Sequence, residues 1–192
     1  MSFTKESVCT EARSYKMFHP GSVSVETLQE LYSIAKWAPT ANNCCPLRVV
    51  FVTSQKGMQD LHDSAMEGNK AKVATAQAAA ILAYDVHFYE QFPKLAPHVP
   101  NPAPQARWSE EEKEKEAIKN AGIQAGFFMA AARGLGLDCG PMAGFYADKI
   151  QESFFQNDSW RYYFVVLLGR GDANALYPRG ERLSAEEACI FV

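Results

Sequence analysis

A chain of 192 residues with 47% hydrophobic and 21% charged side chains has the composition of an ordinary folded domain. At this length one core can bury roughly 70% of the surface that the unfolded chain exposes, so neither disulfides nor a metal is required to hold it. The formal net charge of −3 argues against the basic surface with which nucleic-acid-binding proteins neutralise phosphates. We therefore expect a single domain over residues 1–192 and no nucleic-acid partner.

The apolar runs and the cysteines indicate in which cellular compartment the protein is located. No apolar run approaches the roughly 20 residues needed to span a bilayer. The N-terminal segment lacks the apolar stretch of a secretion signal. The five cysteines cannot all pair within one chain, and none forms a C-x-x-C motif. These features predict reduced thiols, a cytoplasmic location and no membrane partner.

The first helix is predicted where apolar residues recur at helical spacing between Val25 and Ala35. Ser24 is placed to cap its start, and Pro39 ends the pattern after Trp37. The pattern therefore predicts a helix over residues 25–37.

Two strands, a helix and a loop are predicted next. The β-branched run Arg48–Thr53 indicates a buried strand, and Gln59–Met66 indicates a helix. The alanine-rich run Ala78–Tyr84 favours a second strand, although its alanines leave a helix possible. Five prolines fall between Gln91 and Gln105, and each removes a backbone donor, which predicts an irregular loop that could act as a flexible lid.

A long helix is predicted from Glu110 to Leu137, with solvated charges in its first half and an apolar surface nearly all round in its second. That second half should be buried in the core or in a subunit interface. Arg161–Gly169 is the most apolar run and predicts a central strand, and Ser184–Ala188 predicts a short helix. The order of the predicted helices and strands along the chain indicates a mixed α and β architecture without regular βαβ repeats.

The histidines and cysteines are the residues that could carry metal or thiol chemistry. The four histidines lack the spacing of metal ligands, so we expect no metal site. Cys44 and Cys45 follow a loop after a helix, where a thiolate can be stabilised. The two cysteines can equally fill packing space near a turn.

Glycine-rich segments do not match a dinucleotide fingerprint, which needs a strand before the glycines and a helix after them. Gly134–Gly140 follows a helix, and no helical pattern opens behind Gly169–Asp172. A bound phosphate would therefore depend on side chains. Guanidinium groups and a hydroxyl suit this task, although the same residues can be ordinary surface charges. The candidates lie in two clusters, near the N-terminus and the C-terminus: Arg13, Ser14 and Lys16, then Arg179 and Arg182.

Five segments together resemble the FMN-dependent nitroreductase family, in an order and spacing that cover nearly the whole chain. They are RSYKMF (Arg13–Phe18), WAPTANNCCP (Trp37–Pro46), GNKAK (Gly68–Lys72), LGLDCGPMAGF (Leu135–Phe145) and PRGERLS (Pro178–Ser184). The fourth segment, the HFYEQFPKLAPH run and the ending RLSAEEA are most similar to the malonic semialdehyde reductases, also called 3-hydroxypropanoate dehydrogenases.

The resemblance implies an α+β fold: a three-layer sandwich with a mixed, mainly antiparallel sheet flanked by helices. It also implies an intertwined homodimer with FMN at the subunit interface. The apolar helix from Ile118 to Leu137 would then be buried against the partner chain, and the two cationic clusters would meet.

The resemblance further assigns roles around the flavin. Arg13, Ser14, Arg179 and Arg182 would hold the FMN phosphate. Lys16 and Lys72 would lie near the pyrimidine edge of the ring, where cations stabilise the negative charge of the reduced flavin, with Asn69 hydrogen-bonded to the ring.

A loop and a glycine complete the implied cofactor site. Pro39, Thr40 and Asn43 would contact the ring and ribityl chain, including the flavin of the other subunit. Gly144 would offer its backbone N–H to flavin N5, because a residue without Cβ allows the close approach. No side chain is assigned as a catalytic acid or base.

Three positions depart from the wider family. Cys45 and Leu47 stand where Gln and Trp are frequent, and Ala143 stands where many members carry Glu. These changes weaken the transfer of nitroaromatic or quinone specificity and leave FMN binding intact.

The expected function is therefore reduction of a small aldehyde acid by NADH or NADPH, with malonic semialdehyde converted to 3-hydroxypropanoate. Arg107 is a candidate for the substrate carboxylate, with an exposed loop charge as the alternative. Two other functions stay open: a broad NAD(P)H nitroreductase or quinone reductase, and a flavin- or thiol-based redox sensor using Cys44 and Cys45.

Overall fold

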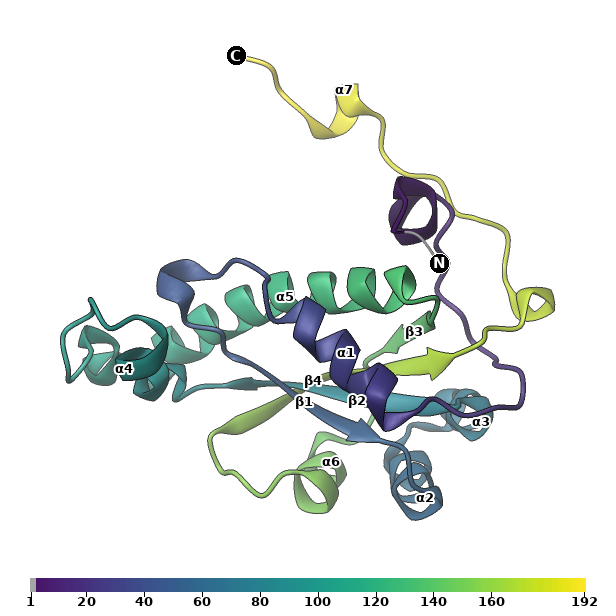
Figure 1. The fold of residues 1–192 in the computed structure, drawn as a ribbon, viewed down its shortest axis with the longest axis horizontal. Coiled ribbons are helices and arrows are strands. Elements are labelled where there is room, and N and C mark those ends of the chain that lie inside the picture. The colour runs from purple at the N-terminus through teal and green to yellow at the C-terminus, as the bar shows by residue number, and fades with distance from the viewer. Residues whose placement is uncertain (1–2) are drawn as a thin grey trace.

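A computed structural model describes residues 3–192, so residues 1 and 2 of the expected domain lie outside the described residues. A four-stranded sheet with the order β1-β2-β4-β3 forms the middle layer, and all its strand pairs are antiparallel (Figure 1). The strands are β1 (Leu47–Val52), β2 (Ala78–Asp85), β3 (Asp138–Met142) and β4 (Trp160–Gly169). One isolated parallel bridge, from Ser14 to Cys139, extends the pairing beyond β3.

Helices cover both faces of the sheet. One face carries α1 and α5, and the other carries α2, α3 and α6 (Figure 1). The helices are α1 (Val25–Ala35), α2 (Gln55–Ser64), α3 (Glu67–Thr75), α4 (Phe92–Leu95), α5 (Glu110–Gly134), α6 (Ala147–Phe154) and α7 (Ala185–Ala188). The three-layer α+β arrangement implied by the resemblance is confirmed.

Strand β2 explains why its sequence shows no alternation of apolar and polar residues. Leu82 and Tyr84 pack in the core on the α1/α5 side, whereas Ile81 and Ala83 pack in the core on the α2/α6 side. A strand buried on both faces needs apolar residues at every position. The strand interpretation of the alanine-rich run is therefore correct, and β4 is the second interior strand, as predicted.

The helix α5 begins at a capping box in which Ser109 and Glu112 satisfy each other's backbone N–H groups. It ends at Gly134 rather than at the predicted Leu137. Gly136 has a φ of 80°, which turns the chain into β3 and ends the helix earlier than its apolar pattern suggests. One face of α5 is buried on the sheet, while Ile123 and Phe127 remain 43% and 47% exposed.

The proline-rich segment is less irregular than predicted. Pro93 lies in the first turn of α4, where a missing backbone N–H costs nothing, and Phe92 beside it is buried. Pro104 similarly begins a 3₁₀ turn over Pro104–Arg107. The remainder of 91–105 is loop.

The last part of the chain runs past the N-terminal turn, a short helical turn over Glu6–Thr10, and away from the sheet (Figure 1). Its apolar side chains Leu183, Ile190 and Phe191 are 70%, 90% and 87% exposed. Within residues 3–192, none of the helices combines the length and apolarity that crossing a bilayer requires.

Candidate functional site

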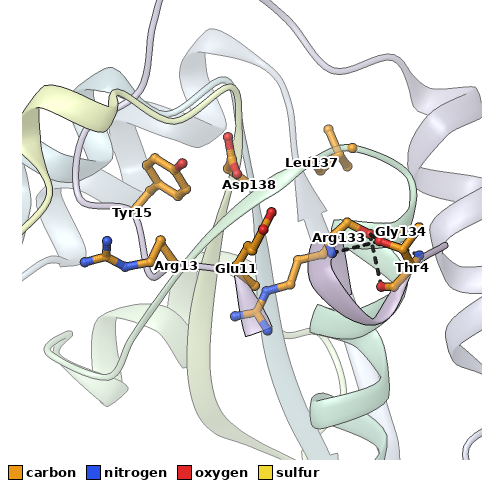
Figure 2. A pocket seen from close by; sticks show the side chains of 11 residues that line it. Thr4, Glu11, Arg13, Tyr15, Arg133, Gly134, Leu137 and Asp138 are labelled. Atoms are coloured by element: carbon orange, nitrogen blue, oxygen red, sulfur yellow. Dashed lines mark hydrogen bonds between the residues drawn. The ribbon is translucent and has the colours of Figure 1, made fainter. Parts of the chain in front are cut away.

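A cavity of about 440 Å³ lies where the N-terminal segment, the end of α5 and the C-terminal segment meet; we call it the arginine cavity. The two cationic clusters come together here, as expected: Arg13 Nη2 donates to the Tyr177 carbonyl at 2.5 Å, and Arg179 Nη2 donates to the Ala12 carbonyl at 2.8 Å. The lining residues are Cys9, Ala12, Arg13, Ser14, Lys16, Arg133, Leu176, Tyr177, Pro178, Arg179, Gly180 and Arg182. A second cavity adjoins it and shares Ala12, Arg13 and Arg133 (Figure 2).

The arginine cavity is strongly cationic. Four arginines and one lysine line it, and none of the lining residues is Asp or Glu. Among the described residues, none of these five cations forms an ion pair with a carboxylate. Lys16 instead lies over the Tyr177 ring, with Nζ 3.0 Å from the centroid. Uncompensated guanidinium groups around one space favour a bound phosphate.

A second group of predicted residues, Asn69, Lys72 and Gly144, meets between α3 and the β3–α6 connection; we call it the ring cluster. Asn69 Nδ2 donates to the Gly144 carbonyl at 3.0 Å, and Lys72 Nζ donates to Asn69 Oδ1 at 2.8 Å. A Cβ on Gly144 would lie 2.4 Å from Asn69 Nδ2. A larger residue at this position would therefore force the Asn69 amide to move away.

The N-terminal segment connects the arginine cavity to the ring cluster. The Tyr15 N–H donates to the Cys139 carbonyl at 2.9 Å. The Phe18 N–H donates to Thr75 Oγ1 at 3.3 Å, and that hydroxyl donates to the Lys72 carbonyl at 3.0 Å. Residues 13–18 thus run from the arginine cavity to the end of α3. This segment therefore links the predicted phosphate-binding residues to the predicted ring-binding residues.

The predicted loop residues Pro39, Thr40 and Asn43 lie elsewhere in this chain. The Ala41 N–H donates to Asn120 Oδ1 at 2.8 Å, which fixes the loop against the middle of α5. Arg133 lies further along the same helix, about 20 Å away at the rise of an α-helix. A single chain therefore does not bring this loop to the arginine cavity.

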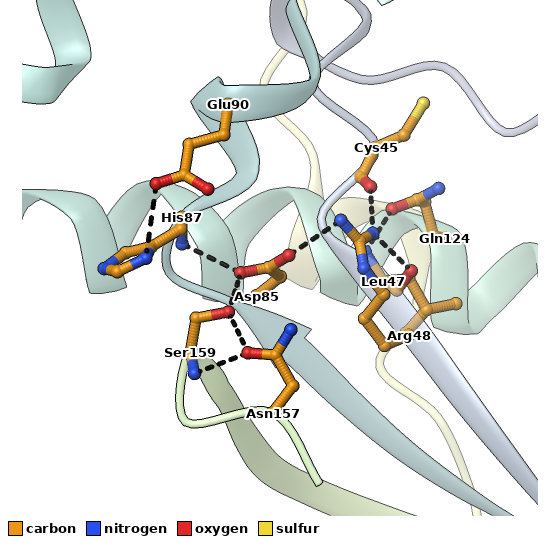
Figure 3. Close-up of polar contacts among 9 residues, drawn as sticks. All are labelled: Cys45, Leu47, Arg48, Asp85, His87, Glu90, Gln124, Asn157 and Ser159. Atoms are coloured by element: carbon orange, nitrogen blue, oxygen red, sulfur yellow. Dashed lines mark hydrogen bonds and ion pairs between the residues drawn. The ribbon is translucent and has the colours of Figure 1, made fainter. Parts of the chain in front are cut away.

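An ion pair that the sequence reasoning missed supports this loop. Arg48 Nη2 lies 2.8 Å from Asp85 Oδ2, and Arg48 Nη1 donates to the Cys45 carbonyl at 2.8 Å (Figure 3). Ser159 Oγ donates to Asp85 Oδ1 at 2.8 Å. The contacts lie beside a cavity of about 1010 Å³ that Arg48, Asp85 and Cys45 help to line.

The two loop cysteines differ in environment. Cys44 is buried, and burial raises the pKa of its thiol to about 11. Cys45 is half-buried, and its Sγ lies 3.2 Å from Asn43 Oδ1 and 3.7 Å from Thr40 Oγ1. A raised thiol pKa disfavours a nucleophilic thiolate, so the packing interpretation suits Cys44 better.

Arg107, the candidate for a substrate carboxylate, is exposed in the 3₁₀ turn before α5. It lies at the opposite end of α5 from Arg133, about 35 Å away along the helix. Within one chain it therefore does not approach the arginine cavity, and it does not line that cavity.

The sequence reasoning also missed Arg133. It is the only charged residue between Lys119 and Asp138, within an otherwise apolar and amide-bearing run. That isolation is a signal readable from sequence, because charged residues are rarely buried without a partner.

Comparison with known proteins decides the family. The model of the nitroreductase family matches residues 10–170. The chain belongs to the nitroreductase family. A relative from Leptothrix cholodnii named "Putative NADH dehydrogenase/NAD(P)H nitroreductase" is 42% identical over 185 residues, covering 95% of this chain and 93% of that protein. A relative of the same kind from Cupriavidus pinatubonensis is 43% identical over 182 residues, covering 93% and 92%.

Solved structures agree in fold with this nitroreductase-family chain. A crystal structure of a "putative nitroreductase" in complex with FMN, from Exiguobacterium sibiricum, has a TM-score of 0.88 at 21% identity and covers 100% of this chain and 99% of that one. A nitroreductase family protein from Streptococcus pneumoniae has a TM-score of 0.86 at 22% identity, covering 98% and 100%. The family and fold that the sequence segments imply are confirmed.

Proposed function

We propose that this protein is an FMN-dependent NAD(P)H oxidoreductase. The observation that carries the proposal is the arginine cavity, in which five cations and a serine hydroxyl surround a space free of carboxylates. A phosphate monoester is the ligand chemistry that such a set fits best. The names of the relatives, which refer to NADH dehydrogenase and NAD(P)H nitroreductase, support the choice of electron donor.

The residues of the chain divide into two tasks. In the arginine cavity, Arg13, Ser14, Arg179 and Arg182 bind the phosphate. In the ring cluster, Asn69 and Lys72 present polar groups to the pyrimidine edge, and Lys16 lies on the segment between the two sites. The hydrogen bond from Lys72 to Asn69 fixes both side chains before the cofactor arrives, which is the preorganisation that stabilises developing negative charge.

Gly144 performs its task through its backbone. Its carbonyl accepts from Asn69 and from the Met66 N–H. Within the described residues, no hydrogen bond engages its own N–H. That donor is free to meet a flavin nitrogen, and the missing Cβ allows the approach.

Bound FMN supplies two-electron transfer between a nicotinamide and an acceptor. The acceptor that we propose is malonic semialdehyde: NAD(P)H, one proton and the aldehyde give NAD(P)⁺ and 3-hydroxypropanoate. The support is the resemblance of Leu135–Phe145 and of the ending RLSAEEA to the malonic semialdehyde reductases. The carboxylate of this substrate requires a cation, for which Arg107 stays a candidate.

We also propose a homodimer with the cofactor at its interface. Ile123 and Phe127 form an apolar stripe on the outer face of α5, and the C-terminal segment carries further exposed apolar side chains, among them Leu183, Ile190 and Phe191. Within one chain the loop at Pro39–Asn43 lies beside the middle of α5, about 20 Å along the helix from the arginine cavity. A second subunit would bring a loop to each flavin.

The relatives' names favour a broad NAD(P)H nitroreductase as the second candidate function. The purified protein, loaded with FMN, should be assayed with NADH and with NADPH against malonic semialdehyde, nitrofurazone and menadione. We expect the highest kcat/KM with malonic semialdehyde. A semialdehyde rate at background, with turnover of the other two acceptors, would assign the broad reductase instead.

A further inference from the structure

The side chain of Arg133, in the last turn of α5, is incompletely paired. Its Nη1 donates to the Val8 carbonyl at 3.2 Å, whereas its Nε is buried and without a hydrogen-bond partner within the described residues. Buried polar groups are normally hydrogen-bonded, because an unpaired one costs its full desolvation penalty. Because Nε is buried, it does not itself face the cavity. Within the described residues no hydrogen bond engages Nη2, which is the donor free to meet a ligand.

Arg133 lies where an anion would meet it. It lines both the arginine cavity and the adjoining cavity, and its side chain extends from the end of α5 toward the segment that carries Glu11 and Arg13 (Figure 2). The carboxylates of Glu11 and Asp138 line only the adjoining cavity. Neither forms an ion pair with Arg133, and Asp138 Oδ2 accepts the Gly171 N–H at 2.8 Å.

Two influences already act on this cation. The negative end of the α5 dipole stabilises a positive charge in the last turn, and the Val8 carbonyl accepts one of its donors. Both are compatible with a residue that only anchors the N-terminal turn. Neither offsets the positive charge of the four other cations that line the arginine cavity together with Arg133 and repel it. A dianion in the cavity removes this repulsion and offers acceptors to the remaining donors.

We propose that Arg133 is a phosphate-binding residue: its guanidinium binds the dianionic phosphate monoester of FMN together with Arg13, Arg179 and Arg182, and thereby selects FMN over riboflavin. The inference rests on the proposed function, because it assumes that the arginine cavity holds the cofactor phosphate. It adds a group from α5, the longest helix of the described chain, to a site otherwise built from the two terminal segments. A rigid helix gives the phosphate a fixed point of attachment.

The test compares two ligands that differ only in the phosphate. Dissociation constants of FMN and riboflavin are measured by quenching of flavin fluorescence for the wild type, Arg133→Gln and Arg133→Lys. Arg133→Gln should weaken FMN binding about 10- to 100-fold, since a charge-assisted hydrogen bond is lost. Riboflavin binding should stay within about twofold of the wild type. Arg133→Lys keeps the charge and loses the planar fork, so its FMN dissociation constant should lie between those of the wild type and Arg133→Gln.

Arg170→Gln is the matched control, because Arg170 is exposed and lines neither cavity. It should change neither constant. Equal weakening of FMN and riboflavin binding by the Arg133 variants would assign an anchoring role to Arg133 and overturn the inference. FMN binding that neither variant changes would also overturn it. Should Arg133→Gln fail to fold, Arg133→Lys provides the same comparison. A wild type that binds no FMN would refute the proposed function itself, which separates the two failures.

Discussion

The substitution Gly144→Ala tests the ring cluster most sharply. The added Cβ would lie 2.4 Å from Asn69 Nδ2. An ordinary contact needs about 3.4 Å or more, so the amide must move by about 1 Å. Such a shift breaks the hydrogen bond from Asn69 to the Gly144 carbonyl and displaces Asn69 from Lys72. Asn69 and Lys72 then no longer present their polar groups to the ring, and the loss of two hydrogen bonds to the flavin amounts to about 2 kcal/mol, or ~30-fold in the dissociation constant.

The assay is flavin binding by fluorescence quenching, with FMN and riboflavin in parallel. Because the ring cluster faces the ring and not the phosphate, Gly144→Ala should weaken both ligands by the same factor. Gly68→Ala is the matched control: it lies beside Asn69 in α3, and a Cβ there meets nothing within 4 Å. It should leave binding unchanged and stabilise the helix by about 0.5–1 kcal/mol. Wild-type flavin binding by Gly144→Ala would refute the reasoning.

Three further predictions concern the interface, the buried ion pair and the thiols. Phe127→Glu should convert a dimer into a monomer in light scattering and abolish retention of FMN; a dimeric variant would contradict the proposed interface. Asp85→Ala leaves Arg48, only 20% exposed, without its carboxylate, and should cost about 3 kcal/mol, lowering Tm by ~6–12 °C; an unchanged Tm would show that the pair contributes nothing. Cys44, whose pKa is raised to about 11 by burial, is ~0.1% thiolate at pH 8. Alkylation followed by mass spectrometry should therefore modify exposed Cys189 at least about 100-fold faster than Cys44, with the gap narrowing as pH rises. Equal rates would favour the thiol sensor.

Elements with a strong local signal were predicted well. The capped periodic run that became α1, the β-branched run of β1 and the apolar run of β4 each appear within a few residues of the expected bounds. The helix predicted from Gln59 instead begins at Gln55, because Ser54 caps it by accepting the Gly57 N–H at 3.1 Å.

Besides α4, which lies in the segment predicted to be a loop, three elements escaped prediction. Strand β3 contains Gly140 and Pro141, which are poor strand formers, and it exists because its whole length pairs with β4. Helix α3 buries only Val73, so its sequence carries little periodicity. Helix α6 is short and was likewise not anticipated. In each case tertiary contact outweighs local preference.

The candidate site was predictable in part. Residue types and the family resemblance located both cationic clusters, and the structure brings Arg13 and Arg179 to one cavity. Sequence separation carries no information on such contacts, so the Arg48–Asp85 pair became visible only in three dimensions. The isolated charge of Arg133 is readable in the sequence, but its place beside the arginine cavity is not.

The visible spectrum of the purified protein shows whether it binds FMN, reduces the flavin with a nicotinamide and passes the electrons to malonic semialdehyde. The protein is mixed with FMN, desalted, and then treated with NADH or NADPH without oxygen. We expect retained flavin close to one per subunit, bleaching on addition of the nicotinamide, and return of colour on addition of malonic semialdehyde. Bleaching without return of colour would support the assignment as an NAD(P)H oxidoreductase and refute malonic semialdehyde as its substrate. A colourless protein after desalting would contradict the assignment of the arginine cavity to the FMN phosphate.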